Sequence, residues 1–194
     1  MSTILIYDSG DSGAGRVRQL LERAAGAASE PLTVLDASEL KLKACIGCFG
    51  CWIKSPGICV LKDDGGPDYL RRLVAADRVV FASAVRWGSY GSGVKYCADR
   101  MLPLLHPYFR RVYGRMHHRL RYGRYPRSLA VGFGAANAAE ADCFRDYTGA
   151  QRDNLASRDP ADSWVWPAGA DLADEAGAVA LQAWFSGRLK GGSV

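Results

Sequence analysis

The sequence predicts a three-layer α/β sandwich built on a parallel sheet. Short apolar runs alternate with amphipathic helical patterns along most of the chain, which is the order of a βαβ protein. The runs are apolar along their whole length, as expected of strands covered on both faces. No apolar run approaches the roughly 20 residues that a membrane span needs. We therefore expect one globular domain over residues 1–189, followed by a disordered tail at 190–194.

Each predicted element follows from its local pattern. The strands are expected at 3–7, 32–35, 78–82, 128–132 and 164–166. The first helix carries an apolar stripe of Val17, Leu20, Leu21 and Ala24, which is the 3.6-residue spacing of a helix packed on a sheet. Further helices are expected at 67–76, 94–105, 139–156 and 172–189.

The loops after the first, third and fourth strands are where a ligand is expected, because α/β sheets bind ligands beyond the carboxyl ends of their strands. The first loop offers hydroxyls at Ser9 and Ser12 and bare backbone amides at its glycines, next to the positive end of a helix. Asp8 and Asp11 oppose a phosphate there unless they point away or cap the helix, and Arg16 offsets them. The alternative is a plain strand-to-helix turn.

The third-strand loop, 82–93, mixes glycine and serine with two aromatic residues. Trp87 and Tyr90 between glycines can flank a planar ring, although a tryptophan packed into the core would give the same pattern. The fourth-strand loop, 132–137, repeats the glycine-rich composition more faintly.

Four of the six cysteines, at positions 45, 48, 51 and 59, fall in a loop over 44–64. Spacings of two residues between the first three suit three corners of a [4Fe–4S] cluster, with Cys59 as the fourth ligand. Unligated or redox-active thiols are the main alternative, and zinc and a disulfide fit less well. Cys97 and Cys143 lie in helical patterns and are predicted to be core residues.

Charge is concentrated in a basic segment at 103–127, which holds seven arginines and no acidic residue. The rest of the chain has 18 basic and 20 acidic residues. This composition suits contact with an anion or an acidic surface, or it is a solvated face with tyrosines beneath it. The amino terminus shows no basic leader, so we expect a cytoplasmic protein with reduced thiols and no membrane partner.

Two stretches carry a family resemblance. The run CIGCFGCWIKSPGICVLKDD, followed by VVFASAVRWGSYGSGVKYCADR, resembles the NADPH-dependent FMN reductases of flavodoxin-like fold, and among them the iron-sulfur flavoproteins. The likeness extends over residues 3–105. It implies a five-stranded parallel sheet of order 2-1-3-4-5 that binds FMN.

The resemblance also implies a set of site residues. The phosphate would lie on Ser9, Asp11, Ser12, Gly13, Ala14, Gly15 and Arg16. The isoalloxazine ring would lie against Ala84, Val85, Arg86, Trp87, Gly88 and Ser89, with further contacts from Gly132, Gly134 and Asn137. The metal ligands would be Cys45, Cys48, Cys51 and Cys59.

The predicted function is an FMN-dependent oxidoreductase that takes hydride from NADPH or NADH and passes electrons to a small-molecule or protein acceptor, directly or through a [4Fe–4S] cluster. The alternative is a non-enzymatic flavin or iron-sulfur electron carrier or redox sensor. A zinc-stapled nucleic-acid binder leaves the glycine-rich loops unexplained, so no nucleic-acid partner is expected. The resembled family implies a homodimer or homotetramer. Arg110, Arg111 and Arg115 are candidates for the extra phosphate of NADPH, with the basic segment as a wall of the nicotinamide site or a subunit contact.

Overall fold

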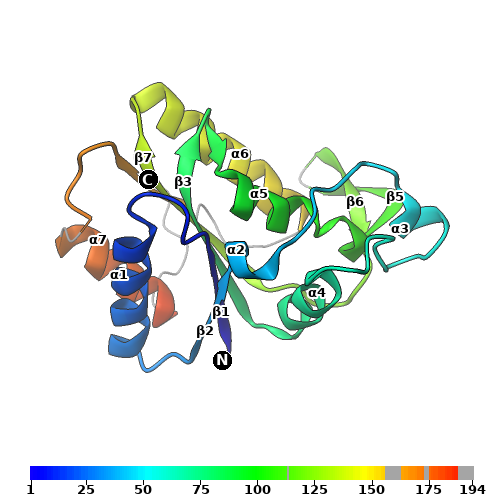
Figure 1. Cartoon of the computed structure of the whole chain (residues 1–194), viewed down its shortest axis with the longest axis horizontal. Coiled ribbons are helices and arrows are strands. Elements are labelled where there is room, and N and C mark those ends of the chain that lie inside the picture. Colours follow the sequence, from blue (N-terminus) through cyan, green and yellow to red (C-terminus); the bar gives the residue numbers. More distant parts are fainter. Residues whose placement is uncertain (113, 156–162, 173–174, 188–194) are drawn as a thin grey trace.

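A parallel sheet of five strands forms the centre of the molecule, in the order β2-β1-β3-β7-β8 (Figure 1). The structure, a computed structural model, describes residues 1–112, 114–155, 163–172 and 175–187. The strands are β1 (Thr3–Tyr7), β2 (Leu32–Asp36), β3 (Arg78–Arg86), β7 (Arg127–Ala135) and β8 (Ser163–Pro167), and a two-residue strand, β4 (Ser89–Tyr90), pairs antiparallel with β3. In chain order the five parallel strands follow the pattern 2-1-3-4-5, so the predicted sheet order is confirmed.

Alternating strand residues pack against helices on the two faces of the sheet. Leu5, Val80 and Val131 face α1 (Ala14–Ala27) and α7 (Glu175–Phe185). Ile6 and Phe81 face the other layer. That layer contains α4 (Gly66–Ala75), α5 (Ser92–Asp99) and α6 (Ala138–Asn154). The apolar stripe predicted for the first helix is fully buried, which confirms it.

Several predicted boundaries were wrong. The fourth strand, predicted to end at Gly132, continues to Ala135, and the helix predicted at 172–189 is shorter. The third strand continues past Ala82 to Arg86, because its next residues pair with β7 on one side and with β4 on the other. The helix predicted at 94–105 ends at Asp99 and is followed by the 3₁₀ turn η1 (Leu102–Leu104). Pro103 disfavours a continuing α-helix, since it removes a backbone donor. The predicted tail at 190–194 lies outside the described residues.

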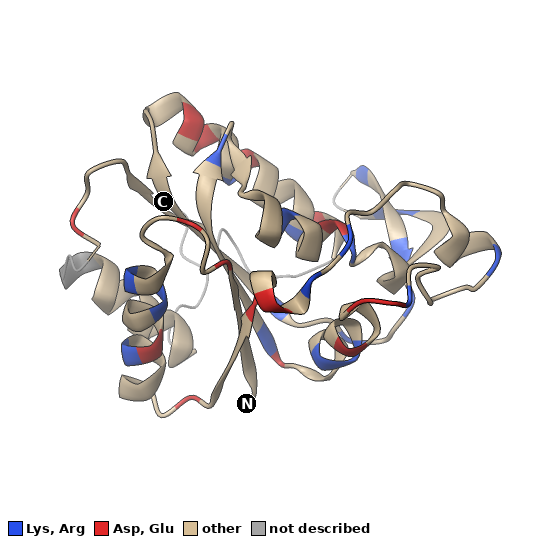
Figure 2. Cartoon of the chain, viewed as in Figure 1, with Lys and Arg blue, Asp and Glu red and all other residues tan. Residues whose placement is uncertain are grey.

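The basic segment forms a β-hairpin that the sequence patterns did not predict. Strands β5 (Leu105–Val112) and β6 (Arg115–Leu120) pair antiparallel in a sheet of their own. The hairpin lies at the end of the molecule opposite α1, beside α3 (Gly50–Ile53) (Figure 1). Lys and Arg residues recur along this end (Figure 2).

The cysteine-bearing loop does not leave β2 directly. A single helical turn, α2 (Ala37–Leu40), comes first, with Asp36 as its N-cap. The chain then crosses to the hairpin, forms α3, and returns to α4. The cysteine loop thus lies beside the hairpin and apart from the carboxyl ends of β1, β3 and β7 (Figure 1).

Candidate functional site

The loops after β1, β3 and β7 meet at one edge of the sheet, as the sequence predicted. Asp11 of the first loop accepts a hydrogen bond from the amide of Ala84 at 3.2 Å. A Cβ atom on Gly13 would lie 3.6 Å from the ring of Phe133 on β7. The three loops lie close together because β3 lies between β1 and β7 in the sheet, so the carboxyl ends of these strands are neighbours.

The first loop presents backbone amides at the start of α1. Gly13 is the N-cap, with φ of 93°, a conformation that favours glycine. No side chain caps this end, and its first turn has no acidic residue. Within the described residues the amides of Ser12, Gly13 and Gly15 have no hydrogen-bond acceptor. Unpaired amides at the positive end of a helix dipole suit a phosphate group.

The two aspartates of this loop contact groups other than the start of α1. Asp8 accepts from the amide of Gly10, and a Cβ atom on Gly93 of α5 would lie 2.0 Å from its Oδ2. Asp11 lies against the backbone of Ala84. Burial raises the pKa of Asp11, the amide of Ala84 opposes this, and the charge of Asp8 adds to it. Neither carboxylate caps α1, so the amides at its N-terminus stay accessible.

β2 supports the first loop through Asp36. Its Oδ1 accepts from the amides of Ser9 and Ser38 at 3.2 and 3.0 Å, and the two serine hydroxyls lie 3.1 Å apart. Partial burial opposes ionisation of Asp36, but the hydrogen bonds from Ser9 and Ser38 outweigh it and lower its pKa. The hydrogen bonds of Asp36 therefore hold Ser9, a residue of the first loop, next to Ser38 of α2.

β3 and β4 are joined by a two-residue turn, Trp87-Gly88. Both residues have positive φ, 53° and 69°, as a type I′ hairpin turn requires. Trp87 is 96% exposed, so the alternative that it packs into the core is wrong. A bulky residue in this conformation costs about 1 kcal/mol, which packing of the indole does not offset here.

Glu140 on α6 connects this turn to the β7 loop. Its Oε2 accepts from the amide of Ala136 at 2.6 Å. This hydrogen bond is the largest cause of the lowered pKa of Glu140, and the amides of Gly88 and Trp87 lower it further. Asn137 is the N-cap of α6 and accepts from the amide of Glu140 at 2.9 Å. The two loops are therefore tied together at the sheet edge.

The remaining predicted flavin contacts divide between exposed and buried positions. Arg86 and Gly134 are exposed, and Gly134 has φ of 75°. Ala84 and Val85 are buried within β3, and their side chains pack in the hydrophobic core. Gly132 is also buried, and a Cβ atom there would lie 2.8 Å from Val85. We assign Gly132 to packing.

The hydrogen-bond donors at this edge of the sheet match the chemical groups of an FMN molecule. Free amides at the start of α1 match a phosphate, and the exposed residues of the other two loops lie beside them. The exposed cation of Arg86 lies near Asp11 and Glu140. Its charge opposes the rise in the pKa of Asp11 that burial causes, and it adds to the lowering of the pKa of Glu140 by the amide of Ala136.

The four loop cysteines converge on one small recess. They line it together with Ile46, Phe49, Val60, Leu61, Asp99, Arg100, Leu102 and Pro103. Burial raises the pKa of Cys51, and the other three thiols add to the shift, Cys59 most. The sequence prediction that these four residues act as a group is consistent with this arrangement.

The donor atoms suit a metal site, but their arrangement does not yet form one. Within the described residues, no three His, Cys, Asp or Glu side chains are placed to hold a metal ion. The recess has a volume of about 20 Å³, near that of one water molecule. A [4Fe–4S] cube is larger, so it would enter only with an outward movement of the loop.

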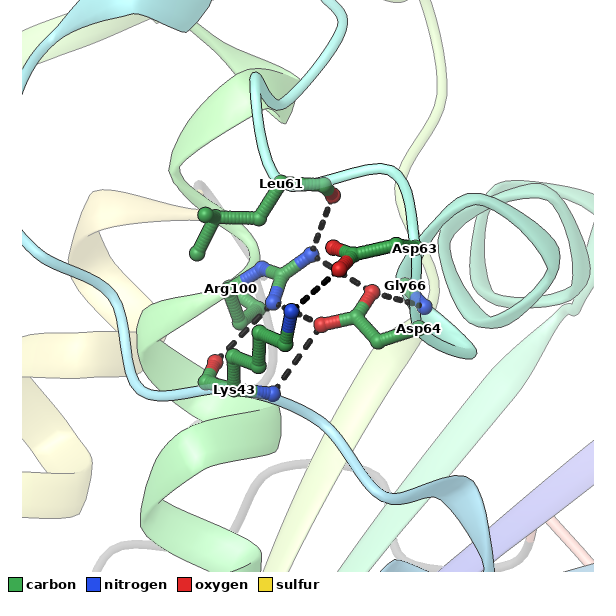
Figure 3. Close-up of polar contacts among 6 residues, drawn as sticks. All are labelled: Lys43, Leu61, Asp63, Asp64, Gly66 and Arg100. Atoms are coloured by element: carbon green, nitrogen blue, oxygen red, sulfur yellow. Dashed lines mark hydrogen bonds and ion pairs between the residues drawn. The ribbon is translucent and has the colours of Figure 1, made fainter.

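Arg100 fixes the two ends of the cysteine loop (Figure 3). Its guanidinium donates to the carbonyls of Lys43 and Leu61 at 2.9 and 3.0 Å and to both carboxylate oxygens of Asp64 at 2.5 and 3.0 Å. Burial opposes ionisation of Asp64, yet Arg100 and the amides of Lys43 and Gly66 lower its pKa to about 2. The sequence patterns did not single out this contact. Both partners nevertheless lie in the two stretches that carry the family resemblance, since Asp64 ends the first stretch and Arg100 ends the second.

The two cysteines predicted as core residues differ. Cys97 is fully buried, and burial raises its pKa to about 12. Cys143 is exposed, which contradicts the prediction. α6 turns this residue toward the β3–β4 turn, where a Cβ atom on Gly88 would lie 2.4 Å from its Sγ.

Aromatic rings join the cysteine loop to the hairpin. Trp52 stacks on Phe49 with ring centroids 5.0 Å apart, and its ring is tilted against that of His118 at a centroid distance of 4.8 Å. The ring of His118 in turn lies 4.7 Å from that of Phe109. The hairpin therefore packs on the cysteine loop and lies apart from the sheet edge (Figure 1). Of the two roles expected for the basic segment, this position favours a subunit contact over a wall of the nicotinamide site.

Solved structures with the same architecture are similar over nearly the whole chain. One is an FMN-dependent NADH-azoreductase from Bacillus anthracis str. Ames Ancestor in complex with FMN, with TM-score 0.64 and 13% identity over 97% of this chain and 99% of that one. Oxidised flavodoxin 1 from Bacillus cereus matches with TM-score 0.56 and 8% identity over all of both chains. The fold is flavodoxin-like.

A third flavodoxin-like neighbour is the NAD(P)H:quinone oxidoreductase from Methanothermobacter marburgensis, with TM-score 0.57 and 13% identity over 97% of this chain and 96% of that one. No family model and no curated protein sequence matches the chain. In the described residues no helix is both long and apolar enough to cross a membrane.

Proposed function

We propose that the chain is an FMN-dependent NAD(P)H oxidoreductase. The observation that carries this proposal is the group of unpaired amides at the start of α1, placed beside the exposed turn after β3. The flavodoxin-like fold supports it, as does its similarity to an FMN-dependent NADH-azoreductase and an NAD(P)H:quinone oxidoreductase.

In this proposal the first loop holds the phosphate. The amides of Ser12, Gly13 and Gly15 donate to it, together with the exposed hydroxyl of Ser12. Arg16, exposed in the first turn of α1, adds a positive charge. Asp8 and Asp11 stay turned toward Gly10 and Ala84, which keeps their charges off the phosphate.

The turns after β3 and β7 would hold the ring. When bound, FMN accepts hydride from the nicotinamide and delivers electrons to an acceptor, so no catalytic triad is required of the protein. The Arg86 guanidinium, exposed at the end of β3, would stabilise negative charge on the reduced ring. Glu140 keeps the two turns in register through the amide of Ala136.

A [4Fe–4S] cluster on the four thiols stays a prediction, and we derive no step through it. Iron and acid-labile sulfide analysis of protein purified without oxygen tests it directly. The predicted homodimer or homotetramer can be measured on the same preparation by light scattering.

The flavin proposal is tested by titrating the apoprotein with FMN and following the quenching of flavin fluorescence. We expect saturable binding of one FMN per chain. FMN that stays free at micromolar protein would contradict the proposal. A flavin that binds but is not reduced by NADPH or NADH would favour the electron-carrier alternative.

A further inference from the structure

The cysteine loop folds back on itself between Cys51 and Cys59. The amide of Gly57 donates to the carbonyl of Cys51 at 2.9 Å, and the amide of Ile58 donates to the carbonyl of Ser55 at 2.8 Å. Gly57 has φ of 85°, a conformation that favours glycine, so it can close this turn. The chain just before Cys59 is therefore hydrogen-bonded to the backbone of Cys51.

A second contact brings the chain just after Cys59 to the same place. A Cβ atom on Gly50 would lie 2.5 Å from Cγ1 of Val60, which is far inside van der Waals contact, so glycine leaves room for this approach. Gly50 precedes Cys51, and Val60 follows Cys59. The chain on both sides of Cys59 thus lies against the segment that carries Cys51.

The side chains of these two residues share the small thiol recess. Both cysteines line it, and both are free thiols. Cys51 is 7% exposed, and Cys59 is half-buried. Burial is the main cause of the raised pKa of Cys51, and among the other thiols Cys59 adds most to the shift. Together with the backbone contacts, this identifies Cys51 and Cys59 as neighbouring free thiols.

Of this pair, Cys59 is also reached from a second, larger hollow. It lines a groove of about 450 Å³ between the cysteine loop and α4, whose other lining residues include Ile58, Leu70 and Val74. No other cysteine in the described part of the chain lines this groove. The recess itself has a volume of about 20 Å³, which admits one water molecule. A small reagent in the groove therefore reaches Cys59 first, and Cys51 stays shielded by its burial.

We propose that Cys51 and Cys59 form a reversible disulfide when the protein meets a hydroperoxide. The recess is too small for a [4Fe–4S] cube, but it holds these two thiols together. The loop is then an oxidation site in place of the predicted cluster, because both uses need the same thiols. A hydroperoxide suits the groove, since it is small and uncharged and accepts two electrons when its O–O bond breaks. Such a disulfide is transient, so it also forms in a reducing compartment.

The chemistry takes two steps. The sulfur of Cys59 attacks the terminal oxygen of the hydroperoxide, the O–O bond breaks, and the alcohol leaves with the thiol proton, or water leaves in the case of hydrogen peroxide. Cys59 is then a sulfenic acid. The sulfur of Cys51 attacks it, the S–S bond forms, and the hydroxyl group leaves as water with the proton of Cys51. The two thiols lose two electrons, and the hydroperoxide gains them.

Peptide mapping tests the proposal, because trypsin cuts between the two cysteines. Cleavage after Lys43, Lys54 and Lys62 gives one peptide, 44–54, with three cysteines and another, 55–62, with Cys59 alone. Protein purified without oxygen is treated with hydrogen peroxide, its remaining thiols are alkylated, and the digest is analysed by mass spectrometry. We expect the two peptides to be joined by a disulfide at Cys51, and dithiothreitol should separate them.

Cys51→Ser and Cys59→Ser should each abolish the joined peptides. Cys48→Ser is the matched control. Cys48 lines the same recess and is exposed, but it lies outside the proposed pair, so the joined peptides should persist in this variant. If Cys51→Ser does not fold, fragmentation of the joined peptides from the wild-type protein still assigns the partner of Cys59.

Three results would overturn the proposal. The first is a pair of peptides that stay separate when peroxide has removed two thiols per chain. The second is a disulfide within 44–54 while Cys59 stays free. The third is stoichiometric iron and acid-labile sulfide in the anaerobic protein, because the thiols would then hold a cluster.

The outcome is separable from that of the flavin site. Disulfide formation without FMN binding leaves this proposal standing, and FMN binding without the disulfide removes this proposal alone.

Discussion

Arg100 and Asp64 form an ion pair in which both side chains are 1% exposed, with Nη1 of the arginine 2.5 Å from Oδ2 of the aspartate. Arg100 follows α5, and Asp64 ends the cysteine loop. The pair therefore holds the end of the cysteine loop against the end of α5, a helix that packs on the sheet. Buried pairs add little over apolar packing, but removal of one partner leaves an uncompensated charge.

Asp64→Asn should lower the free energy of unfolding by about 3–5 kcal/mol, because the charge of Arg100 would stay buried without its counter-ion. Asp63→Asn is the control. Asp63 pairs with Lys43 but is 69% exposed, so solvent screens this pair and its loss should cost far less stability than the loss of Asp64. Urea unfolding of the two variants measures the difference. Equal losses would show that the buried pair does not fasten the loop.

The same pair predicts an acid dependence of stability. The pKa of Asp64 is about 2 in the folded protein, below its ordinary value of 3.8. A lowered pKa means that the stabilisation is fully present above about pH 4 and is lost as the pH falls toward 2. The stability difference between wild type and Asp64→Asn should thus shrink over this window. A difference that stays constant down to pH 2 would contradict the assignment.

Ser12→Asp should weaken FMN binding at least about tenfold, because a carboxylate would face the phosphate at the start of α1. The same charge at a helix N-terminus slightly stabilises the apoprotein, so a loss of folding is not expected. Ser29→Asp, just beyond the other end of α1, is the control. Ser29 has φ of 54°, a conformation that aspartate tolerates. Fluorescence titration of both variants should show a large loss only for Ser12→Asp.

Trp87→Asn should raise the free energy of unfolding by about 1 kcal/mol, since asparagine suits the first position of a type I′ turn. The 96% exposed indole contributes no burial that would be lost. Trp87→Phe keeps a bulky ring and should leave stability unchanged. Thermal unfolding of the apoproteins compares the three. A less stable Trp87→Asn variant would mean that the indole packs against protein, and then our account of the turn is wrong.

The sheet and its ligand edge follow from the sequence because buried strands read as apolar runs and because glycines mark the turns that bare the backbone. The hairpin does not, since the strand pattern of β5 and β6 is hidden by arginines on both faces and by Pro107. The contacts of Arg100 could not be predicted either, although the residue itself lies in one of the two resembling stretches. Its partners lie 36 to 57 residues away, and only the folded chain brings them together.

Cys143 and Gly132 show a second limit. A helical pattern says that a residue lies on a helix, but the packing partner decides whether it is buried, and Cys143 faces the β3–β4 turn at the surface. In the sequence, a glycine that leaves its backbone amide free for a ligand cannot be told apart from a glycine that leaves room for neighbouring side chains. Gly132 makes room for Val85 and Phe144.

The central claim is that this flavodoxin-like chain binds FMN at the loop edge and reduces it with a nicotinamide. Anaerobic rapid mixing of the FMN-loaded protein with NADPH, and separately with NADH, tests it most directly. We predict that the visible flavin band bleaches with at least one of the two donors and that the rate saturates with donor concentration. A flavin that stays oxidised with both donors, yet is bleached by dithionite, would contradict the oxidoreductase assignment.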